Sequence, residues 1–235
     1  MNKMDIVIEK LLDDYIDVNL IDGEWNSLIP SHLRHDKIKE DLKADAQLPE
    51  LSILLECAIK ILSTEDSKHY LDLRDYEKMV KQFSEAGDYI EKIDLTKPIE
   101  EDYASLLHFD DSTMQSIFKI AQEKYNENKI EESFSIFALL STLKPETFDY
   151  WYRMGIIAHQ MQQYAFALKA FTNATYFYPD LLGSRIFSAD CHLKLGQIEN
   201  AKTELNEAKI LMEKEQPESY WLDLYSQFEN NLKAA

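Results

Sequence analysis

The chain has 235 residues, of which 45% are hydrophobic and 29% charged, and this balance excludes wholesale disorder. Only five glycines and six prolines occur, which argues against an all-β architecture and favours long helices. The 43 acidic and 25 basic side chains give a net charge of −18, so attraction to nucleic acid or to an anionic membrane surface is disfavoured.

Residues 1–102 carry three amphipathic stretches without an internal repeat, and they predict a helical region. Their apolar faces carry Ile6, Ile8, Leu11, Leu12, Tyr15 and Ile16 in the first, Leu51, Ile53, Leu54, Ala58, Ile61 and Leu62 in the second, and Tyr76, Met79, Val80, Phe83, Tyr89 and Ile90 in the third. Because three exposed apolar faces would be costly, we expect this region to pack on or beside the part that follows it.

Pro98 and the acidic run 100–102 predict a boundary, which divides the chain into a helical region at 1–102 and a repeat domain at 103–235. A spacing of 34 residues separates Pro145 from Pro179 in that second part. The pattern between them is typical of a tetratricopeptide repeat, and it consists of Trp151-x2-Met154-Gly155-x2-Ala158, Ala167-x3-Phe171 and Ala174. Small residues such as Gly155 and Ala167 let two antiparallel helices approach closely.

The register predicts repeats near 114–147, 148–181 and 182–215. We expect helices near 112–127, 130–143, 147–161, 164–177, 181–195 and 198–213, with Asp110, Asp111 and Ser112 at the first N-terminus. The turn Leu195-Gly196 supports the third, degenerate repeat. A last amphipathic helix at 217–232 would cap the stack. The predicted fold is all-α: a right-handed superhelix of three helix pairs with a capping helix and an additional N-terminal helical region.

Motifs for catalysis are missing from this sequence. It contains no Gly-rich phosphate loop, no G-x-S-x-G elbow and no H-E-x-x-H helix, so we predict that the protein is not an enzyme and needs no cofactor. His32 and His35 have only Asp36 nearby as a third ligand, and we interpret them as solvated histidines without a metal. Cys57 and Cys191 form no CxxC pair, which is typical of a reduced intracellular protein. The sequence contains no run of 18 apolar residues, so we do not expect it to insert into a membrane.

The concave face of a stacked-repeat superhelix is lined by the first helix of each pair. On this register the candidate peptide-binding residues are Phe118, Gln122, Tyr125, Tyr152, Ile156, His159, Ile186, Asp190 and Leu193. An apolar and aromatic strip on such a face predicts a groove for an extended peptide. The alternative is that helices of the N-terminal half fill the groove and make these residues part of the core.

The chain from Ser105 onward resembles the class II type III secretion chaperones. The likeness lies in residues 117–145, 150–179 and 187–208, and in the Ala189-Asp190-Cys191 triplet, Gly196 and Gln163-Tyr164. It implies a bacterial cytoplasmic chaperone that keeps hydrophobic translocators or effectors soluble before secretion. In this family a P-x-L-x-x-P segment of the translocator lies in the groove, and the positions that match are Phe118, Tyr125, Tyr152, Ile156 and His159. Residues 1–104 exceed the short N-terminal arm of such chaperones, and the resemblance leaves a homodimer open.

A second hypothesis is a general tetratricopeptide scaffold, or a regulatory adaptor, that joins folded intracellular partners. A chaperone should bind an aggregation-prone client through its groove, whereas a scaffold should bind soluble proteins.

Overall fold

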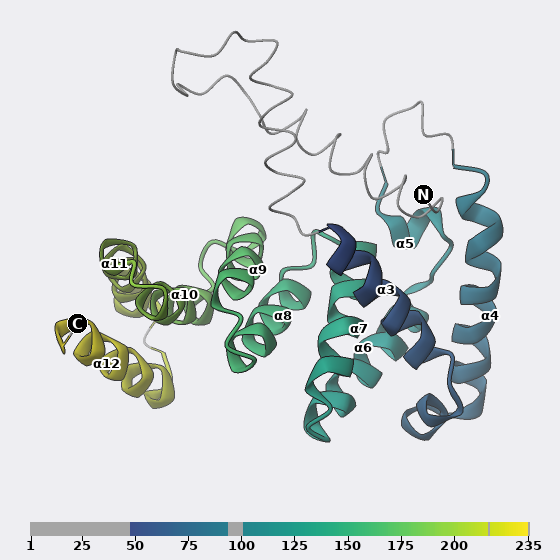
Figure 1. Ribbon diagram of the computed structural model, residues 1–235, viewed down its shortest axis with the longest axis horizontal. Helices are drawn as coiled ribbons and strands as arrows, with labels where there is room; N and C mark the ends of the chain where they lie inside the picture. Colours follow the sequence, from purple (N-terminus) through teal and green to yellow (C-terminus); the bar gives the residue numbers. More distant parts are fainter. Residues whose placement is uncertain (1–47, 94–100, 216, 235) are drawn as a thin grey trace, which may run out of the picture.

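A computed structural model of the protein describes residues 48–93, 101–215 and 217–234. The stripe from Ile6 to Ile16 and the pair His32 and His35 lie outside the described residues. Those that are described form helices joined by turns, with no strand among them (Figure 1). The all-α prediction is confirmed.

The N-terminal part of the described chain packs against the first repeat. It comprises α3 (Leu48–Leu62), the short 3-10 helix η1 (Glu65–Tyr70), α4 (Leu73–Ile90) and α5 (Tyr103–Leu106). Helix α3 packs on α7 and α4 packs on α6, and one hydrophobic core continues from these helices into the first two repeats. The hydroxyl of Tyr70 donates a hydrogen bond of 2.7 Å to Glu127, which joins η1 to the turn after α6. Residues 48–93 therefore pack beside the first repeat as expected, and the division of the chain at residue 102 stays a prediction.

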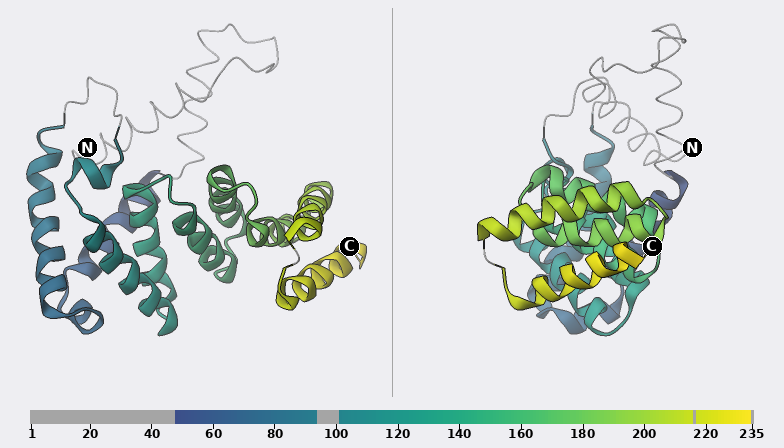
Figure 2. Two further views of the ribbon diagram at one scale, coloured as in Figure 1. Left: turned by 180° about the vertical axis from the view of Figure 1, so that it is seen from behind. Right: turned by 90° about the vertical axis from the view of Figure 1, so that its left-hand side faces the viewer.

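Three helix pairs and a last helix follow. They are α6 (Asp111–Asn126), α7 (Ile130–Leu143), α8 (Phe148–Gln160), α9 (Tyr164–Phe177), α10 (Leu182–Lys194), α11 (Ile198–Glu215) and α12 (Ser219–Ala234). Each begins and ends within two residues of the position that the 34-residue register predicts. Figures 1 and 2 show the pairs stacked in a row, with α4 at one end and α12 at the other.

The turn between the two helices of each pair repeats with the sequence. Asn128, Gln162 and Gly196 are spaced 34 residues apart and have φ angles of 61°, 62° and 72°. After each of them a backbone N–H bonds back to the preceding helix: Lys129 to Lys124, Gln163 to Ala158 and Gln197 to His192, at 2.8–2.9 Å. This is the left-handed C-terminal cap that favours glycine. All three repeats have this cap, but only the third has a glycine there, Gly196.

Close helix crossings occur where the sequence places small residues. A Cβ atom added to Gly155 would lie 2.6 Å from Cε1 of Phe171, so α8 and α9 leave no room for a larger side chain. Ser133 takes the place of Ala167 in the first repeat, where its hydroxyl donates a 2.8 Å bond to the carbonyl of Ala121.

Helix α12 covers the open end of the stack. Phe228 is buried against Ile186, Leu205 and other residues of α10 and α11. A Cβ atom on Gly183 would lie 2.7 Å from the ring of Trp221, so α12 approaches α10 closely. The predicted capping helix is confirmed.

Candidate binding groove

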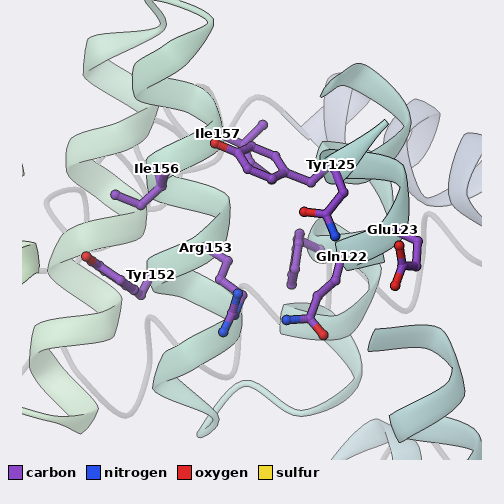
Figure 3. Close-up of a pocket in the computed structure, with 9 residues that line it drawn as sticks. Gln122, Glu123, Tyr125, Tyr152, Arg153, Ile156 and Ile157 are labelled. Carbon is purple, nitrogen blue, oxygen red and sulfur yellow. The ribbon is translucent and has the colours of Figure 1, made fainter. Parts of the chain in front are cut away.

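A pocket of about 300 Å³ lies between the first and second repeats. Helices α6 and α8 form most of its wall, as the close-up in Figure 3 shows. It is lined by Gln122, Glu123, Tyr125, Asn126, Phe137, Tyr152, Arg153, Ile156 and Ile157. The described residues of α3 and α4 contribute nothing to this wall, so the N-terminal helices of the described chain do not fill the groove.

Tyr125 and Tyr152 both line this pocket, and their surroundings differ. Tyr125 is 37% exposed, and its hydroxyl donates a 3.0 Å hydrogen bond to the side chain of Gln160 at the end of α8. Burial raises the pKa of Tyr152 to about 12, so this phenol stays neutral at any physiological pH. A Cβ atom added to Gly183 would clash with the Tyr152 hydroxyl. Tyr152 therefore also packs against the third repeat.

Arg153 brings a positive charge to the groove. Its Nε donates to Asp149 Oδ2 at 2.8 Å, one helical turn earlier on α8. Its guanidinium lies 5.0 Å from the centre of the Phe118 ring, and that ring in turn contacts Phe137 and Tyr150. Phe118 is therefore half-buried beneath Arg153 and takes part in the core as well as in the concave face.

The structure places Gln122, Tyr125, Tyr152 and Ile156 together in the pocket wall, and distributes the other predicted site residues elsewhere. Nε2 of His159 lies 2.7 Å from Oδ2 of Asp190, whose side chain is only 5% exposed. Leu193 is half-buried on α10.

Ile186 requires a correction, because it does not lie at an open surface. It is fully buried in a core that joins α10, α11 and α12. The sequence register identifies the first helix of each pair but does not show how closely the capping helix covers the third one.

Five residues of this wall are not among the candidate peptide-binding residues: Glu123, Asn126, Phe137, Arg153 and Ile157. The spacing of Asp149 and Arg153 by one helical turn was a usable signal, since such a pair holds an arginine at a fixed place on its helix. Phe137 reaches the pocket from the second helix of its pair, which the concave-face rule leaves out.

The titratable side chains of the described ranges form no metal site. No group of three His, Cys, Asp or Glu side chains there is arranged to hold a metal ion. Burial raises the pKa of the Cys191 thiol to about 12, so this thiol is protonated. None of the helices described is long and apolar enough to cross a membrane.

No protein-family model and no curated protein matches this chain. Among solved structures it is similar to a type III secretion system complex from Aeromonas hydrophila, with 18% identity, a TM-score of 0.51, and coverage of 57% of this chain and 87% of that one. It is also similar to the CopN–Scc3 complex, with 17% identity, a TM-score of 0.50, and coverage of 77% and 96%. The translocator chaperone SycD of Yersinia enterocolitica matches at 19% identity and a TM-score of 0.49, over 58% of this chain and all of that one. Over the matched residues the chain therefore shares the fold of the Aeromonas hydrophila and CopN–Scc3 structures.

Proposed function

We propose that this protein is a cytoplasmic chaperone of a bacterial type III secretion system. It binds an extended apolar segment of a hydrophobic translocator or effector in the groove between α6 and α8, and keeps that client soluble before secretion. The observation that carries the proposal is the pocket itself, where Tyr125, Tyr152 and Ile156 lie together on the first helices of two repeats.

The composition of the wall suits an extended peptide. Aromatic and aliphatic side chains can receive the peptide's apolar side chains, and such anchors commonly dominate binding. An extended backbone also has unpaired N–H and C=O groups, which need partners when they leave water. Polar side chains in the wall can act as these partners. They are Gln122, Glu123 and Asn126 on α6 and Arg153 on α8.

The charge of the chain agrees with a solubilising role. A net charge of −18 opposes self-association of the loaded complex. The likeness to a type III secretion system complex supports placing the client in that system.

Calorimetric titration of the full chain with the translocator encoded beside its gene tests the proposal. We expect Tyr125→Ala to weaken binding by about 2 kcal/mol, near a thirtyfold loss of affinity. Tyr125→Phe keeps the ring and removes only the hydrogen bond to Gln160, so it should bind within a few-fold of the wild type. Tyr176→Ala is the matched control, since Tyr176 is 73% exposed and lies outside the groove.

Tyr152→Ala is a less clean variant than Tyr125→Ala, because Tyr152 also contacts the third repeat. Its melting temperature should therefore be measured with its affinity. A folded Tyr125→Ala protein that binds the translocator as tightly as the wild type contradicts the proposal. Binding of soluble folded proteins in place of the translocator would favour the scaffold or adaptor.

A further inference from the structure

A second pocket lies on the opposite side of α7 from the groove. Its volume is about 250 Å³, and its walls come from α3, α4, α5 and α7. Phe137 lines the groove while Leu139 lines this second pocket, and two residues along a helix point about 200° apart. We call it the α3–α4 pocket. Its role is independent of the function proposed for the groove.

The wall of the α3–α4 pocket is almost entirely apolar. Leu55 and Ile59 come from α3, Phe83 and Ile90 from α4, and Leu107 follows α5. Among the described residues of the wall, Thr142 and the phenol of Tyr103 have the only polar side chains. An apolar hollow of this size, open to water, is a surface that folding normally covers.

One position of the wall has no side chain, because it is a glycine. Gly87 lies inside α4, exposed, and a Cβ atom added to it would meet nothing within 4 Å. A glycine in a helix interior costs stability relative to alanine, and it is useful where another backbone approaches closely. Ala86 precedes it, so α4 presents two small residues in succession to whatever lies on the pocket.

The chain itself supplies a segment with the matching pattern. Ile8, Leu11, Leu12, Tyr15 and Ile16 follow the spacing i, i+3, i+4, i+7, i+8, which places them on one face of a helix. The intervening positions are charged and would stay in water: Glu9, Lys10, Asp13 and Asp14. The other two amphipathic stretches of the N-terminal half already bury most of their apolar residues in α3 and α4, with Ile53 as an exposed exception.

The connection favours this segment over other occupants. Residues 1–47 join directly to α3, and α3 contributes Leu55 and Ile59 to the wall within about three turns of Leu48. Residues 17–47 can span up to about 100 Å when extended, so no orientation of the segment is out of reach. A tether of this kind gives an effective concentration in the millimolar range, which an untethered partner rarely attains.

We propose that residues 8–16 form a helix that docks its apolar face into the α3–α4 pocket of the same chain, with Gly87 at the point of closest approach. Docking there leaves the groove between α6 and α8 open, since the two sites use opposite sides of α7.

Disulfide trapping in the full chain tests this proposal. In a Cys57→Ser background, Gly87→Cys would be combined in turn with Ile8→Cys, Leu12→Cys and Ile16→Cys. Cys191 stays in place, because it is fully buried and does not interfere. Gly87→Cys fits without strain, since the space in front of it is open. We expect at least one of the three pairs to form an intramolecular disulfide at least about tenfold faster than the control pair with Lys10→Cys, which lies on the polar face.

The remaining outcomes overturn the proposal. A disulfide that appears only between two molecules would show that a second copy occupies the pocket. Faster trapping of Leu12→Cys by Ile156→Cys than by Gly87→Cys would place the segment in the groove. Equal rates for all pairs, including the Lys10→Cys control, would show that residues 8–16 dock at neither place. As a second measurement, Leu12→Asp should raise amide hydrogen exchange in residues 83–93 and leave exchange in α10 unchanged, whereas equal exchange in residues 83–93 contradicts docking.

Discussion

The imidazole of His159 on α8 and the carboxylate of Asp190 on α10 meet at 2.7 Å, and they join the second repeat to the third. Asp190 is almost fully buried, whereas the side chain of His159 is 23% exposed. The ring of His159 also contacts Tyr164 and Phe187, which fix its orientation. A buried carboxylate is costly without a partner, so loss of His159 should weaken the contact between the two repeats.

The unequal burial predicts unequal costs of mutation. His159→Phe keeps the aromatic contacts but leaves Asp190 buried without its partner, and we expect it to lower the free energy of unfolding by about 3 kcal/mol. Asp190→Ala leaves a histidine that can still bond to water. We expect it to lower the free energy of unfolding by about 1 kcal/mol less than His159→Phe does. The double variant should be more stable than His159→Phe alone. Urea unfolding of the three variants measures this, and strictly additive losses would contradict the pairing.

The crossing of α8 and α9 predicts a cost for any side chain at position 155. Gly155→Leu should destabilise the protein by about 1–3 kcal/mol, because the ring of Phe171 is fully buried and has no space to move into. Ala165→Leu is the control, since it adds the same side chain at an exposed position of α9. Thermal melts followed by circular dichroism compare the two, and equal melting temperatures would show that the crossing tolerates the extra volume.

The 34-residue register in the sequence was enough to place the repeat helices within two residues. Gly155 and Phe171 were recognisable because a close crossing needs a small residue opposite a large one, and both belong to the same repeat. Ile186 and His159 were not predictable in the same way. Their surroundings are set by contacts with α12 and α10, which the pattern of a single helix does not contain.

The turns between paired helices predict two stabilising substitutions. Gln162 and Asn128 adopt φ angles near +60°, a conformation in which glycine avoids the strain of a side chain. Gln162→Gly should raise the free energy of unfolding by about 0.5–1 kcal/mol, and Asn128→Gly by less, since asparagine tolerates this conformation. Gln115→Gly, inside α6, is the matched control and should be destabilising by about 1 kcal/mol. Loss of stability in Gln162→Gly would show that its side chain has a role at the turn.

Asp110 joins α4 to the start of α6 through several hydrogen bonds. Its Oδ1 accepts the backbone N–H of Thr113 at 2.9 Å and caps α6, as the sequence predicts. Its Oδ2 lies 2.6 Å from Nζ of Lys78 and 2.9 Å from Nε2 of Gln82, both on α4. Partial burial works against the charged form, but the bonds from Lys78, Thr113, Ser112 and Gln82 outweigh it and hold the pKa of Asp110 well below its ordinary value.

This lowered pKa predicts a pH-dependent stability. At pH 7 the carboxylate is charged in the folded and the unfolded chain, so its stabilising bonds are fully present. As the pH falls below about 4, the carboxyl of Asp110 takes up a proton in the unfolded chain before it does so in the folded chain. The stabilisation from Asp110 therefore decreases until the pH reaches the lower pKa of the folded state.

Asp110→Asn keeps a capping side chain but removes the charge that attracts Lys78. Because Asp110 is 42% exposed, we expect this variant to lose only about 1 kcal/mol at pH 7. The difference from the wild type should shrink as the pH falls from about 4 to about 2, as measured by urea unfolding at each pH. A difference that stays constant over this range would show that the charge of Asp110 does not stabilise the contact between α4 and α6.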